Sequence, residues 1–280
     1  MSKGELNPPL LPPEFEQLRA LMYGSVGIAL QQGKEELIRT RLLKRLRALG
    51  MTTFAKYLAL VQSPAGTGEF STMVDLLTTN KTNFFREEAH FDFIREHVLP
   101  RHRNERSPVT IWSAGCSSGE EPYTLAMILR DQIPEPTFSK CRILATDLST
   151  IVLERAKLAI YDELNVADVP PEVQTKSFVP APPLGGVRRF EVKAEVRKIV
   201  SFGRLNLNSP DPWPMRGRFD LIFCRNVMIY FDDETRERLV NRFSDALSPG
   251  GFLFIGHSES LSALKVKLRY VKPAVYEKVM

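Results

Sequence analysis

Residues 109–123 of this 280-residue chain read VTIWSAGCSSGEEPY and are the most informative segment of the sequence. Its apolar start predicts a short buried strand. Gly115 and Gly119 lack Cβ atoms where the chain must turn tightly and where a ligand could lie against the backbone. The two acids and the proline that follow suit the first turn of a helix, because the helix dipole favours acids there and proline needs no N–H partner. The stretch therefore predicts a strand, a ligand-binding turn and a helix.

The turn favours a cationic or hydroxyl-bearing ligand over a phosphate. Glu120 and Glu121 would repel a phosphate, and the loop has neither the G-x-G-x-x-G spacing nor a P-loop lysine. S-adenosyl-L-methionine fits better, since it offers ribose hydroxyls, a positive amino group and a positive sulfonium. Taken by itself, the loop is also consistent with a plain tight turn between a strand and a helix.

The apolar runs that follow predict a mostly parallel sheet covered by helices on both faces. Residues 141–147 form a second apolar run that ends in Asp147, an acid placed to accept hydrogen bonds from ribose. Three more apolar runs alternate with helical or loop patterns, at 199–207, 219–224 and 251–257. The segments 268–271 and 275–279, on either side of Pro273, predict an antiparallel edge hairpin that closes the sheet.

The first hundred residues have helical periodicity and no strand pattern. The predicted helices cover 13–22, 35–49, 53–61, 70–77 and 86–102. We therefore expect an all-α N-terminal domain with its linker over 1–85, and an α/β domain over 86–280 that includes a β insertion at 170–198. The fold class is α/β with a Rossmann-like sheet.

Composition narrows the class of protein. The chain is 43% apolar and 25% charged, so we expect a full core and ordinary solubility. It has no 18-residue apolar run and no N-terminal signal pattern, which predicts a cytoplasmic protein without membrane insertion. Three cysteines without C-x-x-C spacing and four scattered histidines predict neither a disulfide framework nor a metal site. We expect a monomer.

The helix predicted at 35–49 carries a dense positive charge. Six basic residues and two acidic residues lie between Lys34 and Arg47, a local net charge of +4. At 100° per residue, Arg41, Lys44 and Arg45 fall on the arc opposite the apolar stripe. Such a face can steer an acidic partner, although a charge run of this kind is also consistent with a simple solvated surface.

Four motifs carry a family resemblance. They are LTTNKTNFFRE at 77–87, SSGEEPY at 117–123, FDLIFCRNVMIYF at 219–231 and GHSE at 256–259. In this order, over nearly the whole chain, they resemble the chemotaxis receptor methyltransferases, the CheR family. The resemblance implies an all-α domain before an S-adenosylmethionine-dependent methyltransferase domain. It also implies methylation of glutamate side chains on the cytoplasmic helical bundle of methyl-accepting chemotaxis receptors, with S-adenosyl-L-homocysteine as the other product.

The resemblance also implies the site residues. Cofactor contacts are expected from the linking segment and four strand ends: Asn80, Thr82 and Arg86 in the linking segment, Glu120 and Asp147 at the first two strand ends, Asn206 and Leu207 at the third, and Asn226 and Val227 at the fourth. We expect Arg86 to hold the cofactor carboxylate in a bidentate pair. Receptor binding is expected from Arg41, Lys44 and Arg45 of the basic helix.

The chemistry expected of this site is modest. A glutamate carboxylate, with a reference pKa of about 4.3, is ionised at neutral pH and needs no general base to attack a sulfonium methyl. Catalysis would come from positioning and from the removal of water around both charges. Arg225 and Tyr230 follow the fourth strand near the cofactor edge and could orient the acceptor, but we assign neither a catalytic role.

Two other functions are consistent with parts of the sequence. The basic helix and the sequence DPWP at 211–214 suggest a nucleic-acid methyltransferase, but such a motif belongs at the end of the strand at 219–224, where this chain has Arg225 and Asn226. A receptor adaptor that binds cofactor without turnover is the second alternative, and the complete set of polar cofactor-facing residues argues against it. In some family members the β insertion binds a receptor tether peptide by strand addition. The short turn at Gly185 and Gly186 disfavours that role here.

Overall fold

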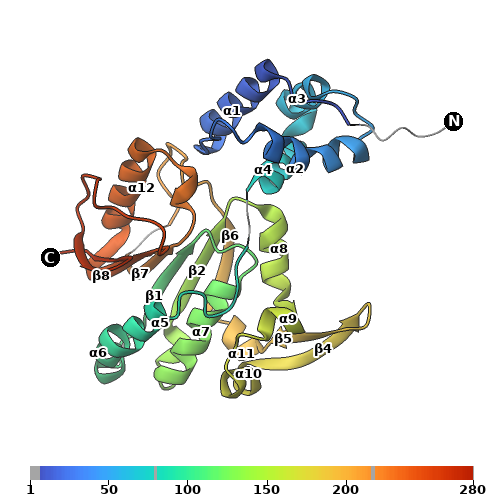
Figure 1. Cartoon of the computed structure of the whole chain (residues 1–280). Helices are drawn as coiled ribbons and strands as arrows, with labels where there is room; N and C mark the ends of the chain where they lie inside the picture. Colours follow the sequence, from blue (N-terminus) through green and yellow to red (C-terminus); the bar gives the residue numbers. More distant parts are fainter. Residues whose placement is uncertain (1–6, 79–80, 216–217, 280) are drawn as a thin grey trace. The chain divides into compact units, whose positions relative to one another are not determined.

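A computed structural model describes residues 7–78, 81–215 and 218–279 of the chain. The chain forms two compact units with a boundary near residue 80, whereas the sequence predicted a boundary at residue 85. One is a helical unit that ends near residue 80 and also includes Tyr230–Asp232. The other is an α/β unit that contains residues 81–229 and 233–280 (Figure 1).

The helical unit packs four helices around an apolar core, as predicted. Its helices are α1 (Pro12–Val26), α2 (Glu35–Ala48), α3 (Phe54–Gln62) and α4 (Thr67–Leu77), with a 3₁₀ turn, η1 (Pro64–Gly66), before α4. Met22 of α1, Leu42 and Leu46 of α2 and Tyr57 of α3 are fully buried. The Thr53 hydroxyl accepts the Lys56 N–H and caps α3, which is the preferred use of threonine at a helix start.

The basic face of α2 is less solvated than we expected. The Arg45 guanidinium donates to both oxygens of Glu69 in α4, at 2.6 Å for the shortest contact, and the Tyr57 hydroxyl donates to the same carboxylate at 2.9 Å. Arg41 donates to the backbone carbonyl of Leu77 at 2.5 Å. Lys44 is exposed. Two of the three basic side chains therefore stabilise their own unit, because long-range partners that local periodicity cannot reveal lie within their reach.

The α/β unit is built on a seven-stranded sheet with the order β6-β2-β1-β7-β8-β10-β9. Its strands are β1 (Thr110–Ala114), β2 (Arg142–Asp147), β6 (Val200–Arg204), β7 (Phe219–Cys224), β8 (Leu247–Ile255), β9 (Arg269–Lys272) and β10 (Val275–Glu277). The strands from β6 to β8 pair in parallel, and β10 and β9 add antiparallel. The predicted parallel sheet with an antiparallel edge hairpin is confirmed.

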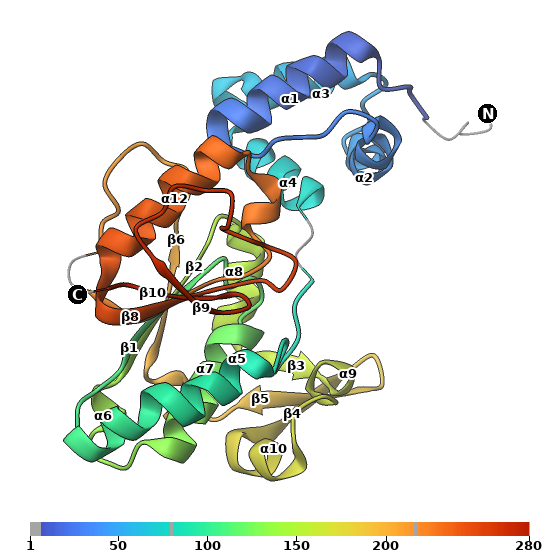
Figure 2. The ribbon, with the colours of Figure 1, turned by 60° about the vertical axis from the view of Figure 1, so that its left-hand side comes forward.

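Helices cover both faces of this sheet (Figure 2). Successive side chains of a strand point to opposite faces, and β1 illustrates the result. Ile111 belongs to the same buried cluster as Leu125 of α7 (Glu120–Gln132). The next residue, Trp112, packs edge-on against Phe243 of α12 (Asp233–Ala246), with ring centroids 5.2 Å apart. The helix α8 (Thr150–Leu158) follows β2, and short 3₁₀ turns lie at η3 (Phe138–Lys140) and η4 (Met228–Tyr230).

The helix predicted over 86–102 begins three residues later than expected, and its middle turn is π-helical. The segment forms α5 (Ala89–Phe93), a π-helical turn, η2 (Ile94–Val98), and α6 (Leu99–Glu105). Phe85 and Glu87 have φ angles of 54° and 58°, so the backbone before Ala89 is left-handed and cannot continue a right-handed helix.

The insertion is a separate three-stranded antiparallel sheet with the order β3-β5-β4, beside α9, α10 and α11 (Figure 1). Its elements are β3 (Ile160–Asp162), α9 (Glu163–Val166), α10 (Pro171–Ser177), β4 (Phe178–Leu184), β5 (Val187–Val192) and α11 (Ala194–Arg197). The sheet includes β3, which precedes the predicted range of 170–198. The edge strand β4 contains Pro180, Pro182 and Pro183, and the Ser177 carbonyl before it accepts the Lys193 N–H at 2.8 Å.

None of the helices in the described residues has both the length and the apolar character needed to cross a membrane.

The ion pair between Arg45 and Glu69 predicts a stability effect. Glu69 is 9% exposed, and the pKa of its carboxyl is lowered mainly by the hydrogen bond from Arg45. Glu69→Gln should lower the free energy of unfolding of the full chain, measured in urea at pH 7, by about 1–3 kcal/mol. Because the folded-state pKa lies below its ordinary value of 4.5, this contribution is present above that value and is lost as the pH falls through the lowered pKa.

The matched control is Glu16→Gln, since Glu16 pairs with Arg19 on the surface of α1 at 57% exposure. It should change stability by at most about 1 kcal/mol. Equal effects of the two substitutions, or a Glu69 effect that does not shrink in acid, would contradict the prediction.

Candidate active site

The candidate site lies where β1, β2 and β7 end at the carboxyl edge of the sheet, the edge at which α/β proteins bind ligands. The loop from β1 to α7 is fastened to the end of β2. The N–H groups of Gly115 and Cys116 both donate to the Thr146 carbonyl, at 2.8 and 2.9 Å. The Ser117 N–H donates to one carboxylate oxygen of Asp147 at 2.8 Å. The predicted ligand turn and the predicted ribose acceptor are therefore in direct contact.

Asp147 is held in place by further backbone groups. Its second carboxylate oxygen accepts the Ser149 N–H at 2.9 Å. An ionised carboxylate has about four lone-pair sites, so it can accept hydroxyl donors in addition to backbone N–H groups. The Asp147 carbonyl accepts the Leu205 N–H at 3.0 Å, which brings the segment after β6 to the same edge.

Asn206 and Leu207 lie two and three residues beyond β6, in a loop and not on the strand that we predicted. The side-chain oxygen of Asn206 accepts the Asn208 N–H at 3.0 Å, a local turn that competes with strand continuation. Leu207 is buried, with 8% exposure. Their contact with the cofactor stays a prediction.

Asn226 and Val227 reach the β1 loop from the end of β7. Asn226 has a φ of 58°, a left-handed conformation that asparagine tolerates better than most residues. A Cβ atom built on Gly115 would lie 2.3 Å from Cγ2 of Val227, so the two segments meet only because residue 115 is a glycine. The loop of β1 and the turn after β7 therefore share one wall of the site.

Glu120 begins α7 beside this wall. Its side chain is buried, and one carboxylate oxygen accepts the Ser118 hydroxyl at 2.7 Å. Burial raises the pKa of Glu120, and the hydrogen bond from Ser118 acts against this. The Glu120 carboxylate can therefore accept a hydrogen bond from a ligand or pair with a positive group on it.

The linking segment is anchored by its aromatic residues. Phe84 and Phe85 are buried, and the Phe85 N–H donates to the Thr124 hydroxyl of α7 at 3.2 Å. The Arg86 guanidinium is half-buried and donates to the Lys81 carbonyl at 2.9 Å. Thr82 is half-buried, and Asn80 lies outside the described residues. The bidentate role predicted for Arg86 stays a prediction.

Sequence reasoning missed the partners of Arg225. The side chain is 3% exposed and donates to Glu87 at 2.9 Å and to Glu121 at 3.1 Å, and it also donates to the backbone carbonyl of Arg86. Glu121 in turn accepts the Ser113 hydroxyl of β1 at 2.6 Å. A signal was present, because an arginine directly after a buried strand must find carboxylates to be buried at all.

The two carboxylates respond differently to Arg225. Burial acts to raise the pKa of Glu87, but the Arg225 guanidinium outweighs it, and the pKa lies below its ordinary value. Burial dominates at Glu121 and raises its pKa, although Arg225 opposes the change. Arg225 is thus committed to a buried network and does not extend into solvent towards an acceptor. Tyr230 groups with the helical unit, where its carbonyl accepts the Ala29 N–H at 2.8 Å.

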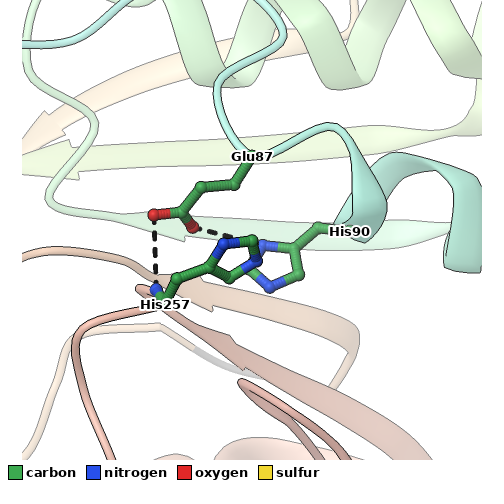
Figure 3. Close-up of side chains that lie close together, drawn as sticks. All are labelled: Glu87, His90 and His257. Atoms are coloured by element: carbon green, nitrogen blue, oxygen red, sulfur yellow. Dashed lines mark hydrogen bonds and ion pairs between the residues drawn. The ribbon is translucent and has the colours of Figure 1, made fainter.

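Glu87 also approaches two histidines (Figure 3). A carboxylate oxygen of Glu87 and one ring nitrogen each of His90 and His257 lie within 4.8 Å of one another. The carboxylate, however, already accepts Arg225 and the His257 backbone N–H. Burial lowers the pKa of His90 to about 3, and Arg225 acts in the same direction. A dication here would face the Arg225 guanidinium, which disfavours a metal ion at this cluster.

The DPWP sequence serves packing. Trp213 stacks under the Arg242 guanidinium at 4.1 Å and meets Trp112 edge-on at 4.7 Å. Arg242 also donates to the carbonyls of Ser209 and Asp211. The motif lies in the loop after β6 and away from the end of β7, which removes the observation that suggested a nucleic-acid methyltransferase.

These groups fit S-adenosylmethionine. Asp147 can accept ribose hydroxyls, the glycine at 115 leaves room against the backbone, and Glu120 can face a positive group. When bound, the cofactor supplies an electrophilic methyl group on a sulfonium. The described residues around the β1 loop contribute carboxylates and backbone, with no lysine cradle of the kind that holds a triphosphate.

Comparisons with known proteins agree with this fit. Residues 80–276 match the family "CheR methyltransferase, SAM binding domain", and residues 13–78 match "CheR methyltransferase, all-alpha domain". A chemotaxis protein methyltransferase of Borreliella burgdorferi is 39% identical over 99% of this chain and 98% of its own. Those of Klebsiella aerogenes and Escherichia coli are 41% and 38% identical, over 91% and 94% of this chain and 86% and 89% of theirs.

Among solved structures, PKMT2 from Rickettsia typhi in complex with AdoHcy is 17% identical with a TM-score of 0.34, and the match covers 58% of this chain and 25% of that one. A likeness of this size carries no argument about function. The two family matches and the relatives that align over nearly the whole chain establish the family. The chain belongs to the CheR family of S-adenosylmethionine-dependent methyltransferases.

Proposed function

We propose that this chain transfers the methyl group of S-adenosylmethionine to glutamate side chains on the helical bundle of methyl-accepting chemotaxis receptors. The products are a glutamyl methyl ester and S-adenosylhomocysteine. The observation that carries the proposal is the match of both CheR domains, in order, over nearly the whole chain, to relatives named chemotaxis protein methyltransferase. The acceptor class comes from that family, and the chemistry of the site is compatible with it.

The site supports a mechanism of positioning. A glutamate acceptor is ionised at neutral pH, so no residue has to remove a proton from it. Asp147 and the β1 loop would hold the ribose, Glu120 a positive part of the cofactor, and Arg86 its carboxylate. The buried network of Arg225, Glu87 and Glu121 would fix the linking segment that carries Arg86. The barrier is then lowered by alignment and by the exclusion of water.

The direct test is transfer of a radiolabelled methyl group to purified receptor cytoplasmic fragments. We expect label on the receptor that is released by mild alkali, as a carboxyl ester requires, and no label after the acceptor glutamates are changed to alanine. Cofactor binding without transfer would instead support the adaptor reading. Label on DNA or RNA with an unlabelled receptor would support a nucleic-acid methyltransferase.

Asp147 tests the cofactor site. Asp147→Ala should weaken S-adenosylhomocysteine binding by about 1–3 kcal/mol, because ribose hydroxyls lose their acceptor, and Asp147→Asn should lose less because one oxygen remains. Calorimetric titration measures the effect. Thermal unfolding without ligand controls for the loss of the contacts to Ser117 and Ser149. Unchanged affinity in a folded Asp147→Ala protein would show that the ribose lies elsewhere.

Arg86 tests the proposed grip on the cofactor carboxylate. Arg86→Ala should weaken S-adenosylhomocysteine binding by roughly tenfold or more, and Arg86→Lys should recover only part of the loss, since lysine cannot form a bidentate pair. The comparison uses titrations with S-adenosylhomocysteine and with its decarboxylated analogue. The analogue should bind the wild type and the variants with similar affinity. Full recovery by lysine would indicate attraction of charges without a defined geometry.

Lys44 tests receptor docking on α2 more cleanly than its neighbours, because Arg41 and Arg45 have partners inside the helical unit. Lys44→Glu should slow receptor methylation at low salt several-fold, with unchanged cofactor affinity and stability. Lys56→Glu, on the exposed face of α3, is the matched control and should have little effect. Raising the salt concentration should also slow the wild type, since exposed charges are screened over about 8 Å at physiological ionic strength. Equal rates of receptor methylation by Lys44→Glu and the wild type would show that Lys44 does not contribute to receptor docking.

A further inference from the structure

Glu259 is a buried carboxylate beside the turns of the candidate site, where backbone N–H groups of the described residues donate to it. It ends the GHSE motif at 256–259 and is 9% exposed. One of its oxygens accepts the N–H groups of Gly256 and Asn226, at 2.6 and 3.0 Å, and the other accepts the Ile229 N–H at 3.1 Å. The Met228 N–H is a further donor. Burial raises the pKa of Glu259, and these backbone donors act against this.

The donors come from two turns that must stay together. Asn226, Met228 and Ile229 belong to the turn after β7, and Gly256 follows β8. The left-handed backbone at Asn226 turns successive N–H groups towards one point, a concave arrangement that binds anions. A Cβ atom on Gly256 would lie 2.5 Å from the side-chain nitrogen of Asn226, so the two turns are in close contact. The Glu259 carboxylate accepts N–H groups from both turns and so links them.

We propose that Glu259 is a positioning residue for methyl transfer: its carboxylate fixes the turn after β7 so that Asn226 and Val227 present their side chains to the cofactor. The inference rests on the cofactor site proposed above. Val227 abuts Gly115 of the β1 loop, so a shift of the turn would move both walls of the site together. Glu259 touches backbone only in this role and takes no part in the chemistry.

A carboxylate is required because both of its oxygens accept. The amide of glutamine has one oxygen and one NH₂ group, so in either orientation it would direct donors at backbone N–H groups that also donate. The substitution Glu259→Gln therefore preserves the size of the side chain and removes the clamp. The matched control is Glu234→Gln, an exposed glutamate in the first turn of α12 of the same α/β unit.

The test combines two measurements on the full chain. Hydrogen exchange monitored by mass spectrometry or NMR should show at least tenfold faster exchange at Asn226, Met228 and Ile229 in Glu259→Gln, with β1 and β2 unchanged. Calorimetry should show S-adenosylhomocysteine binding weakened by tenfold or more. In receptor methylation, KM for S-adenosylmethionine should rise more than kcat falls. Glu234→Gln should match the wild type within twofold in all three.

If these amides exchange at the wild-type rate in Glu259→Gln, the carboxylate does not fix the turn after β7. If exchange is faster throughout the sheet, Glu259 stabilises the whole unit and has no specific effect on this turn. Fast local exchange with wild-type cofactor affinity would overturn its role in positioning the site. If Glu259→Gln does not fold, Glu259→Asp, which keeps the charge and shortens the reach, decides by the same two criteria. The exchange measurement needs no cofactor, so its result stands apart from the Asp147 titration that tests the cofactor site itself.

Discussion

Arg225 is a charged side chain that is only 3% exposed, and its partners join several segments of the α/β unit. Its guanidinium sits between Glu87 and Glu121 and also holds the Arg86 carbonyl. The segments involved are the end of β7, the linking segment and the start of α7, and the Ser113 hydroxyl adds β1 through Glu121. Removing one partner from such a buried pair typically destabilises a protein by about 3–5 kcal/mol, because a buried charge is left without compensation. These contacts therefore anchor the linking segment to the α/β unit at Arg86 and Glu87.

Much of this architecture was accessible from local patterns. The strand, glycine turn and helix at 109–123 predicted β1 and α7, and the later apolar runs predicted the parallel sheet with its edge hairpin. These inferences succeed because alternation, helical periodicity and turn chemistry act over a few residues. The helical character of the first unit was predictable for the same reason. Asp147 ends β2, as the apolar run at 141–147 predicted, and it lies beside the β1 loop because the ends of adjacent parallel strands meet at one edge. Its contact with ribose stays a prediction.

What escaped prediction depends on residues far apart in the chain. Arg45 meets Glu69 across two helices, and Arg225 meets Glu87 from the opposite end of the unit, so no periodicity encodes either pair. The break before α5 depends on left-handed backbone at Phe85 and Glu87, neither of which is a residue that signals such a conformation. The strand β4 was obscured by its prolines, which normally argue against a strand in the interior of a sheet.

Those prolines have a consequence for the small sheet. The Ser177 carbonyl accepts the Lys193 N–H, and the direction of the backbone N–H and C=O groups alternates along an antiparallel strand. The backbone groups of Val179 and Ala181 therefore point towards β5, and those of Pro180 point away from it. Proline has no N–H, and the outer margin of β4 therefore lacks a donor at the centre of the strand. An extended chain that tried to continue the sheet there, from a second molecule or a receptor tail, would leave its own carbonyl unpaired. The outer margin of β4 is therefore a poor template for an added strand.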